Sequence, residues 1–277
     1  MKVLTAIGEF RNEKRKLRNT LGFVPTMGYL HQGHMKLVQT SKKNNSHTAV
    51  SIFVNPTQFS PSEDFSSYPR DLKRDLEMLE KEGVDLVFTP LDKEIYPPDF
   101  QTYVTVEEIS KPLEGSLRHG HFRGVATVVC KLLNIVEPDV AYFGQKDAQQ
   151  VMVIQQMVKD LNMNVIINVV ETAREADGLA ISSRNVYLNA EERKAAPILW
   201  DALTSCKNLY QAGERDANIL REQVVKTITS EPLAKIDYVS IADKQTLAEL
   251  DKVVGRALVS LAVRFGRTRL IDNLILD

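Results

Sequence analysis

Short β-rich segments alternate with helical patterns through the first two thirds of the chain, and this alternation restricts the fold more than any other feature of the sequence. It predicts a parallel sheet, because parallel neighbours need a crossover connection, which is usually a helix. We therefore expect an α/β fold, with a Rossmann-like, doubly wound parallel sheet that carries helices on both faces. The predicted strands are residues 21–26, 48–54, 85–89, 140–143 and 165–170.

Helical periodicity fills the intervals between these strands. Leu72, Leu76 and Leu79 form an apolar stripe, and Gly83 follows where a helix end favours a residue that tolerates a positive φ. In a sheet of this kind ligands bind beyond the carboxyl ends of the strands, so functional residues are expected in the loops that follow the strands. Further helices are expected over residues 35–42, 125–136 and 149–161.

The last third of the chain has a different pattern, in which long helical segments precede strand-like segments. This order predicts a smaller C-terminal α+β domain. The boundary is placed near residue 175, which gives domains of residues 1–175 and 176–277. The helical segments are residues 190–212 and 217–229, and the strand-like segments are residues 237–241, 257–263 and 268–272.

The 277 residues carry 35 basic and 36 acidic side chains, which gives a formal net charge of −1. A balance so close to neutral gives no general attraction to a polyanion, so we expect no nucleic-acid partner and a local site for any anion. No apolar segment approaches the roughly 18–20 residues of a membrane span, and charged residues follow the first short apolar run too soon for a signal peptide. The expected location is therefore the cytoplasm, with no membrane partner.

The first predicted strand runs into the sequence P-T-M-G-Y-L-H-Q-G-H at residues 25–34, and a helical pattern follows at once. Such a junction points backbone N–H groups and the positive end of the helix dipole at an anion, and His31 and His34 add donors there. This arrangement predicts a phosphate site. Gly28 and Gly33 have the spacing of the glycines in a P-loop, but the two residues after Gly33 are not the Lys and Ser or Thr that a P-loop needs, so that motif is excluded.

Three more loops after predicted strands carry distinctive sequences. They are N-P-T-Q-F at residues 55–59, F-G-Q-K-D-A-Q-Q at residues 143–150 and R-E-A-D-G-L-A-I-S-S-R-N at residues 174–185. The H-x-G-H motif alone resembles the signature of nucleotidyltransferases and class I aminoacyl-tRNA synthetases, which form or transfer adenylates. In this order, the four motifs together resemble those of the pantothenate synthetase family. Gln145 and Ile181 depart from the Glu and Met that are more usual there.

The resemblance implies an ATP-dependent ligase that condenses (R)-pantoate with β-alanine. The pantoate carboxylate would attack the α-phosphate of ATP and release pyrophosphate, and the β-alanine amine would then attack the pantoyl adenylate and release AMP. ATP as a substrate, Mg²⁺ carried in with it and a homodimer are implied by the family. The first domain would bind ATP and pantoate, and the C-terminal domain would act as a lid.

The resemblance also implies catalytic roles for six residues, namely His31, His34, Lys146, Ser182, Ser183 and Arg184. The histidines would donate hydrogen bonds to the phosphates, and the lysine would act there as a point charge. The last three residues resemble the flexible K-M-S-K-S-type loop of related adenylating enzymes, which supplies donors to the β- and γ-phosphates. The other residues expected around ATP are Met27, Gly28, Tyr29, Leu30, Gln32, Gly33, Gly144, Gln145, Asp147, Ala173 and Ile181.

Amide side chains suit a substrate that carries hydroxyls and a carboxylate, because they donate and accept without adding a competing charge. Gln58 and Gln150 are therefore expected to bind pantoate, and Asn55 is expected to position an amide beside them. Met27 and Phe59 would supply apolar walls, although core packing is an alternative for both.

Three further residues are second-rank candidates. Arg118 and His121 belong to a segment with which the family covers its substrates, and a mobile charged loop is the alternative. Asp75 is the candidate Mg²⁺ ligand. The simpler interpretation of residues 71–81 is a helix with solvated charges opposite its leucine stripe.

Other functions remain open on the sequence alone. An adenylyltransferase that keeps AMP on its product would also carry H-x-G-H, and release of free AMP distinguishes the two. A class I synthetase fits less well, because neither an anticodon-binding domain nor a basic composition is evident. A non-catalytic ATP-sensing module would not turn over ATP in the presence of both pantoate and β-alanine.

Overall fold

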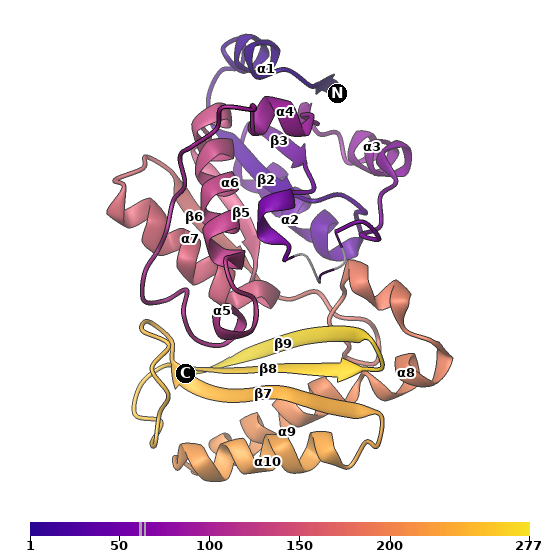
Figure 1. Cartoon of the computed structure of the whole chain (residues 1–277), viewed down its shortest axis with the longest axis vertical. Coiled ribbons are helices and arrows are strands. Elements are labelled where there is room, and N and C mark those ends of the chain that lie inside the picture. Colours follow the sequence, from indigo (N-terminus) through magenta and orange to yellow (C-terminus); the bar gives the residue numbers. More distant parts are fainter. Residues whose placement is uncertain (61–62, 64) are drawn as a thin grey trace. The chain divides into compact units, whose positions relative to one another are not determined.

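The computed structural model describes residues 1–60, 63 and 65–277, and the strands of its first part form one six-stranded sheet (Figure 1). All neighbouring strands are parallel, in the order β1-β4-β3-β2-β5-β6. The predicted doubly wound α/β fold is confirmed, because the chain runs from β2 outward to β4 and then returns to place β5 on the other side of β2. The strands are β1 (Lys2–Leu4), β2 (Leu21–Thr26), β3 (His47–Ile52), β4 (Leu86–Phe88), β5 (Val140–Gly144) and β6 (Ile166–Val170).

Successive residues of a strand point to opposite faces of the sheet, and each face packs against its own helices. Phe23, Ala49 and Phe88 lie in one hydrophobic cluster with residues of α1 (Ile7–Lys14), α6 (His121–Val136) and α7 (Ala148–Asp160). Val24 and Val50 lie in another with residues of α2 (Gln32–Asn44) and α3 (Leu72–Lys81). Both faces of the sheet are therefore buried, which explains why its strands are apolar without alternation. Two short helices, α4 (Asp92–Ile95) and α5 (Glu114–Leu117), belong to the connections.

The sequence indicated five strands, and the edge strand β1 was missed. Three residues are too few to show a period. The strand exists because β4 offers it a partner far along the chain, with Lys2 in register with Leu86 and its N–H donating to the Asp85 carbonyl at 2.9 Å.

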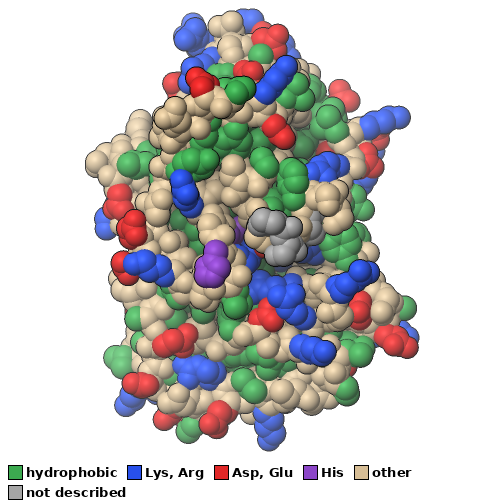
Figure 2. All heavy atoms as spheres, viewed as in Figure 1, with side chains coloured by type: hydrophobic (Ala, Val, Ile, Leu, Met, Phe, Trp, Pro, Cys, Tyr) green, Lys and Arg blue, Asp and Glu red, His purple; other side chains and the backbone are tan. Residues whose placement is uncertain are grey.

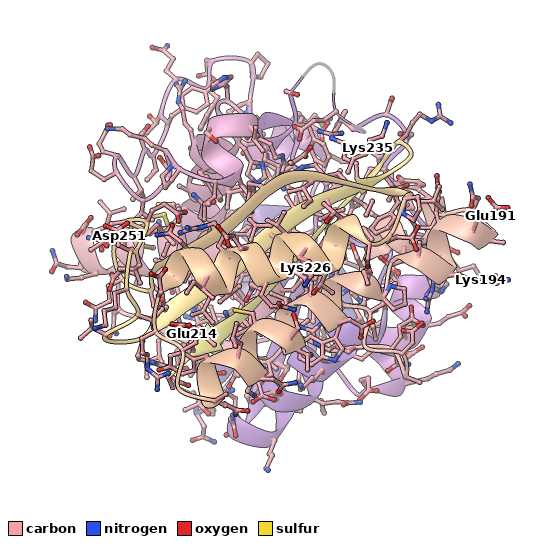
Figure 3. The ribbon with its side chains drawn as sticks, turned by 90° about the horizontal axis from the view of Figure 1, so that it is seen from below. Glu191, Lys194, Glu214, Lys226, Lys235 and Asp251 are labelled. Carbon is pink, nitrogen blue, oxygen red and sulfur yellow. The ribbon has the colours of Figure 1, made fainter. Side chains whose placement is uncertain are left out.

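By its internal contacts the chain divides into two compact units. The first comprises Met1–Gln145 and Gln149–Glu171, and the second comprises Lys146–Ala148 and Thr172–Asp277. In the second unit, β7, β8 and β9 form an antiparallel sheet, and two helices, α9 and α10, cover one face of it (Figure 3). This is the predicted α+β arrangement. The elements are α9 (Ile198–Gln211), α10 (Ala217–Thr229), β7 (Ala234–Asp243), β8 (Ala257–Phe265) and β9 (Thr268–Leu276).

The single helix predicted over residues 190–212 is wrong, since the chain forms α8 (Ala190–Ala195) and then α9. Pro197 lies between them. It has no N–H to donate to the carbonyl four residues earlier, and its ring would clash with that carbonyl in a continuous helix.

The surface carries charge of both signs. On the face shown in Figure 2, Lys and Arg side chains are interspersed with Asp and Glu. Within the described ranges, no helix combines the length and the apolar character of a membrane span.

Arg174 fixes the start of the loop at residues 174–185 within the second unit. Its guanidinium pairs with Asp272 of β9 through two contacts of 2.5 and 2.9 Å and lies 3.7 Å from the ring centroid of Trp200. It also donates to the carbonyl of Gly178 at 3.0 Å. Gly178 has φ +89°, and a Cβ there would lie 2.1 Å from Cδ1 of Trp200. The turn is thus held by a buried ion pair and by a position that only glycine fits.

Replacing Asp272 by Ala should lower the free energy of unfolding by about 3–5 kcal/mol, because it leaves the Arg174 charge without its buried partner. Urea denaturation followed by circular dichroism measures the change. Asp277→Ala, which breaks an exposed ion pair with Arg256, is the matched control and should leave stability unchanged. Equal losses of stability in the two variants would contradict the stabilising role of the Arg174–Asp272 ion pair.

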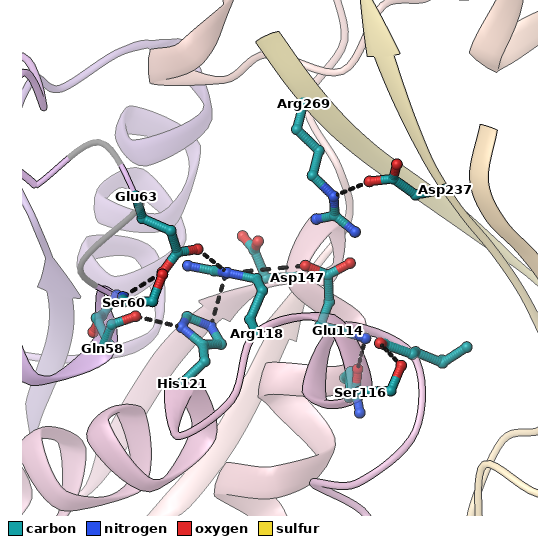
Figure 4. A network of polar contacts seen from close by, with 12 residues as sticks. Gln58, Ser60, Glu63, Glu114, Ser116, Arg118, His121, Asp147, Asp237 and Arg269 are labelled. Carbon is teal, nitrogen blue, oxygen red and sulfur yellow. Dashed lines mark hydrogen bonds and ion pairs between the residues drawn. The ribbon is translucent and has the colours of Figure 1, made fainter. Parts of the chain in front are cut away.

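His121, the first residue of α6, ties this helix to the turn after β3 (Figure 4). Its Nδ1 lies 2.8 Å from the Gln58 carbonyl, and its Nε2 lies 3.0 Å from Nη1 of Arg118. Because a guanidinium has only donors, Nε2 accepts and Nδ1–H donates, so the ring is neutral. Burial, followed by the Arg118 charge, lowers the pKa of His121 to about 4.

This pKa makes stability depend on pH. An unfolded histidine binds a proton below about pH 6.5, whereas the folded ring stays neutral down to about pH 4. Protons therefore favour the unfolded chain in that window, and the free energy of unfolding should fall as the pH drops from 6.5 to 4, by on the order of 3 kcal/mol from this residue. Denaturation series across the window should show a flatter slope for His121→Gln. The exposed neighbour His119 gives the control, and an equal change of slope in His119→Gln would refute the assignment.

Candidate active site

The predicted site loops of the first unit follow strands that are neighbours in the sheet. β2 pairs with β3 on one side and with β5 on the other, all parallel. The loops after these strands start at Met27, Phe53 and Gln145. Since the chain reverses its direction of travel across the sheet between β2 and β5, these loops border the topological switch point, where sheets of this kind bind ligands.

His31 and His34 form a cap on the N-terminus of α2. Nδ1 of His31 accepts from the N–H of Gly33 at 3.2 Å, and Nδ1 of His34 accepts from the N–H of His31 at 3.3 Å. The two rings lie against each other with centroids 4.0 Å apart and planes tilted by 31°. A neutral imidazole whose Nδ1 accepts carries its proton on Nε2. The backbone therefore makes both histidines Nε2–H donors, which is the form that a phosphate needs.

The turn before the histidines is held by Asp75 of α3. The N–H groups of Tyr29 and Leu30 each donate to its carboxylate at 2.7 Å. The sequence analysis expected the N–H groups of this turn to face a phosphate, whereas those of Tyr29 and Leu30 donate to a carboxylate of the protein itself. The interpretation of residues 71–81 as solvated charge is also wrong for Asp75, which is only 1% exposed. Burial raises its pKa, and the bonds from Leu30 and Tyr29 act in the opposite direction.

The surroundings of Asp75 do not resemble a Mg²⁺ site. Both of its oxygens already accept a backbone N–H. Over residues 1–60, 63 and 65–277, no group of three or more His, Cys, Asp or Glu side chains could hold a metal ion. The described residues therefore do not supply the carboxylate cage of a resident cation.

Gln58 and Asn55 of the loop after β3 are brought together with Met27 of the loop after β2. Nε2 of Gln58 donates to Sδ of Met27 at 3.1 Å, and its Oε1 accepts from Nδ2 of Asn55 at 3.0 Å. Asn55 is buried, and its Oδ1 also accepts from the hydroxyls of Thr57 and Tyr96. Asn55 thus orients Gln58, as expected, while its own amide is occupied by protein groups.

Two residues that support this cluster were missed. Tyr96 lies 41 positions from Asn55, and no sequence signal joins them; burial raises the pKa of its hydroxyl to about 12. Gly124, inside α6, accepts from Nδ2 of Asn55 through its carbonyl, and a Cβ there would lie 2.3 Å from the Thr57 carbonyl. A glycine in a helix interior costs stability, and this cost was the available signal of a close backbone approach.

Arg118 lies between two glutamates (Figure 4). Its Nε is 2.5 Å from Glu63, and its Nη1 is 3.9 Å from Glu114. A guanidinium that already has two carboxylate neighbours is a weak receptor for a third. The geometry therefore favours a role for Arg118 in ordering this segment, and its contact with substrate stays a prediction.

Neighbouring glutamines of α7 differ in their surroundings. Gln149, which the sequence analysis passed over, is buried, donates to the carbonyls of Ile109 and Pro112 and accepts from the N–H of Glu114. It anchors the segment that leads to Arg118. Gln150, the predicted substrate ligand, is partly exposed.

Phe59 packs within an aromatic group, with ring centroids 5.4 Å from Phe65 and 5.8 Å from Tyr68. Its side chain is only partly buried. Phe59 therefore packs against other aromatic rings and still exposes part of its side chain, so both the predicted apolar wall and the alternative of core packing remain compatible with its position.

The remaining catalytic candidates belong to the second unit, where β9 supports both of their loops. Asn273 of β9 donates to the carbonyl of Lys146 at 2.8 Å, and the Lys146 ammonium lies 3.7 Å from Asp147. β9 also contacts η3 (Ser183–Tyr187), the single turn that carries Ser183 and Arg184. Ser182 caps this turn by accepting from the N–H of Arg184 at 3.3 Å. The hydroxyl of Ser182 therefore helps to shape the loop that carries the Arg184 guanidinium.

The other predicted ATP residues lie in the same loops or at the ends of the elements that these loops join. Gly144 ends β5, and Ile181 donates its N–H to the carbonyl of Ala173 at 3.0 Å. Gln32 begins α2 and is exposed.

Comparison with known proteins finds relatives that match the whole chain. The family model described as pantoate-beta-alanine ligase matches residues 2–275. The pantothenate synthetases of Roseiflexus castenholzii and Acetivibrio thermocellus are 58% and 55% identical to the chain, with complete coverage of both sequences in each case.

Solved structures give the same result. The pantothenate synthetase of Thermus thermophilus superposes with a TM-score of 0.96 at 45% identity, over 99% of each chain. The pantoate-beta-alanine ligase of Francisella tularensis, complexed with beta-gamma ATP and beta-alanine, superposes with a TM-score of 0.82 at 37% identity, over 99% of this chain and 97% of the other. With its Rossmann-like sheet, its paired histidines and its relatives matched from end to end, the chain belongs to the pantoate–β-alanine ligase family, the pantothenate synthetases.

Proposed function

We propose that the chain catalyses the ATP-dependent condensation of (R)-pantoate with β-alanine to give pantothenate, AMP and pyrophosphate, through a pantoyl adenylate. The observation that carries this proposal is the family match over residues 2–275, which includes both histidines of the N-terminal cap. Formation of AMP that requires both pantoate and β-alanine tests it. An adenylated product without free AMP would instead indicate an adenylyltransferase.

The first step needs stabilisation of negative charge more than it needs covalent help from the protein. The carboxylate oxygen forms a bond to the α-phosphorus, and the bond to the bridging oxygen breaks, so that charge moves onto pyrophosphate. The Nε2–H groups of His31 and His34 would supply hydrogen-bond donors to the phosphates. Lys146 and Arg184 add positive charge to the departing phosphates. Ser182 and Ser183 complete the set as hydroxyl donors.

Mg²⁺ is proposed to enter as part of MgATP. The absence of a carboxylate cage among the described residues supports this, because a Mg²⁺ ion held by phosphates and water needs few protein ligands. Here the protein's task is to bind the nucleotide and orient its α-phosphate.

Pantoate is proposed to bind beside Gln58 and Met27. The contact of Gln58 with Asn55 holds its amide in one orientation, so that it can pair with a hydroxyl or carboxylate of the substrate. Met27, together with Phe59, would meet the two methyl groups of pantoate, and Gln150 would contribute a second amide. Arg118 and His121 would act indirectly, by ordering the segment that is proposed to cover the substrates.

We propose that residues 1–175 bind ATP and pantoate and that residues 176–277 act as a lid. The two units support this in part, since the histidines belong to the first unit and Ser182–Arg184 to the second, but Lys146 also belongs to the second. A homodimer is proposed on the family resemblance alone, and a cytoplasmic location on the sequence pattern alone.

Replacing His34 or Lys146 by Ala should lower kcat by about 10²- to 10³-fold, the usual cost of deleting a preorganised charge-stabilising group. Steady-state assays of AMP release measure this effect. His119→Ala and Lys159→Ala, at exposed positions, are matched controls and should keep full activity. Near-normal turnover in His34→Ala or Lys146→Ala would remove that residue from the catalytic set.

Without β-alanine, the enzyme with pantoate and MgATP should give a burst of about one equivalent of pyrophosphate and retain pantoyl adenylate, because activation resides on the substrate and requires no covalent enzyme intermediate. Rapid-quench analysis measures the burst, and omission of pantoate is the control. Formation of ADP and phosphate would rule out the adenylate route.

A further inference from the structure

We propose that Asp75 is a positioning residue for the ATP-dependent half of the reaction. Its carboxylate holds the turn at Gly28–Leu30 and thereby fixes His34 of the cap as an Nε2–H donor. This inference rests on the proposed function and names a residue of α3 that acts through the backbone of another segment.

The contact is direct and buried. Oδ2 of Asp75 accepts from the N–H of Tyr29, and Oδ1 accepts from the N–H of Leu30, both at 2.7 Å. The side chain comes from 45 positions or more along the chain and is 1% exposed. Hydrogen bonds from N–H groups to a carboxylate are stronger than those between neutral groups, and burial increases their strength.

The turn needs such support because its backbone is unfavourable by itself. Gly28 and Tyr29 both have positive φ, at +81° and +49°. Glycine tolerates this region, but tyrosine does not adopt it without compensation. The two bonds to Asp75 fall on Tyr29 and on the residue after it, where the compensation is needed.

The neighbour of Asp75 holds the other side of the same turn. Arg74 donates through Nη2 to the carbonyl of Leu30 at 2.9 Å, and its guanidinium lies 5.1 Å from the ring centroid of Tyr29. Consecutive residues of α3 therefore form hydrogen bonds with both the N–H and the carbonyl of Leu30.

The sign of the charge supports a positioning role. A carboxylate beside a phosphate-binding turn repels the nucleotide, so affinity for ATP gives no reason for an acid here. An acid is the group that can accept two adjacent N–H donors at once.

The consequence reaches the chemistry through the next residue. His31 follows Leu30 directly, and its N–H is the donor that keeps Nδ1 of His34 in the accepting state. If the turn moves, this bond is lost, Nδ1 of His34 can carry the proton, and Nε2 then has no hydrogen to donate. Asp75 thus selects the tautomer of a ring that it does not touch.

Asp75→Asn tests the proposal, because its amide keeps the size of the side chain but turns a donor toward one of the two N–H groups. We expect kcat/KM for ATP in pantoate-dependent pyrophosphate exchange to fall by about 10- to 100-fold, while pantoate affinity measured without ATP stays unchanged. Long-range ¹H–¹⁵N spectra of the free enzyme should show that His34 has shifted toward the Nδ1–H form.

The matched control is Asp71→Ala, which removes the cap of the same helix, an acceptor for the N–H of Arg74 at 3.1 Å, without touching the turn. It should lower the melting temperature but leave the His34 tautomer and the ATP parameters as in wild type. If Asp75→Asn does not fold, Arg74→Ala should give the same pattern to a smaller extent.

An unchanged His34 tautomer in Asp75→Asn, or an equal loss of ATP parameters in Asp71→Ala, would overturn the proposal. Failure of the proposed function would look different. Wild-type enzyme would then show no pantoate-dependent exchange, whereas the spectra of the free enzyme would still report on Asp75.

Discussion

The pairing of β2 with β5 is the contact on which the arrangement of the first unit depends. β3 and β4 extend the sheet from one side of β2, and β5 and β6 extend it from the other, so the loops after β2 and β5 start side by side. Because all neighbours are parallel, every loop that leaves a carboxyl end lies along the same edge. The motifs met in the sequence are far apart in the chain, and these parallel ladders collect those of the first unit along one rigid edge.

Several of the side chains that offer hydrogen bonds beside β2 and β3 are neutral, while the carboxylate of Asp75 is occupied by backbone N–H groups. Two imidazoles are held by their backbone contacts in one tautomer, a third is kept uncharged by burial, and the amides of Asn55 and Gln58 bind each other. The cation of Arg118 is offset by two glutamates. In the proposed reaction the pantoate carboxylate loses its charge as the anhydride forms. Cations placed directly against this carboxylate would stabilise the starting acid more than the transition state, and neutral donors avoid this loss, whereas the charges of Lys146 and Arg184 are proposed to act on the departing phosphates.

Much of the fold could be predicted because long elements repeat their pattern many times. α10 was expected over residues 217–229 and spans Ala217–Thr229, while β1, with three residues, offered no period to detect. The break between α8 and α9 has a sequence signal in Pro197, which a continuous helix over residues 190–212 does not accommodate.

The sequence indicated candidate site residues where they belong to a local motif. It did not indicate residues that support the site through contacts with distant parts of the chain. His31 and Gln58 lie within recognisable sequences. Asp75 and Gln149 act on backbone groups 35 to 46 positions away, and a helical pattern with mixed charge does not reveal which acid is buried. The simpler interpretation of residues 71–81 placed their charges in solvent. Helical periodicity assigns an acid on the side opposite the leucine stripe to the outer face of the helix.

The close approach at Gly124 ties the proposed pantoate site to the packing of α6. A side chain at this position would force the helix backbone away from the Thr57 carbonyl, next to the residue that is proposed to bind the substrate, Gln58. Under the proposed function, a change of preference toward a larger or smaller hydroxy acid would therefore proceed through the side chains of Met27 and Phe59, because their exchange leaves this backbone contact in place.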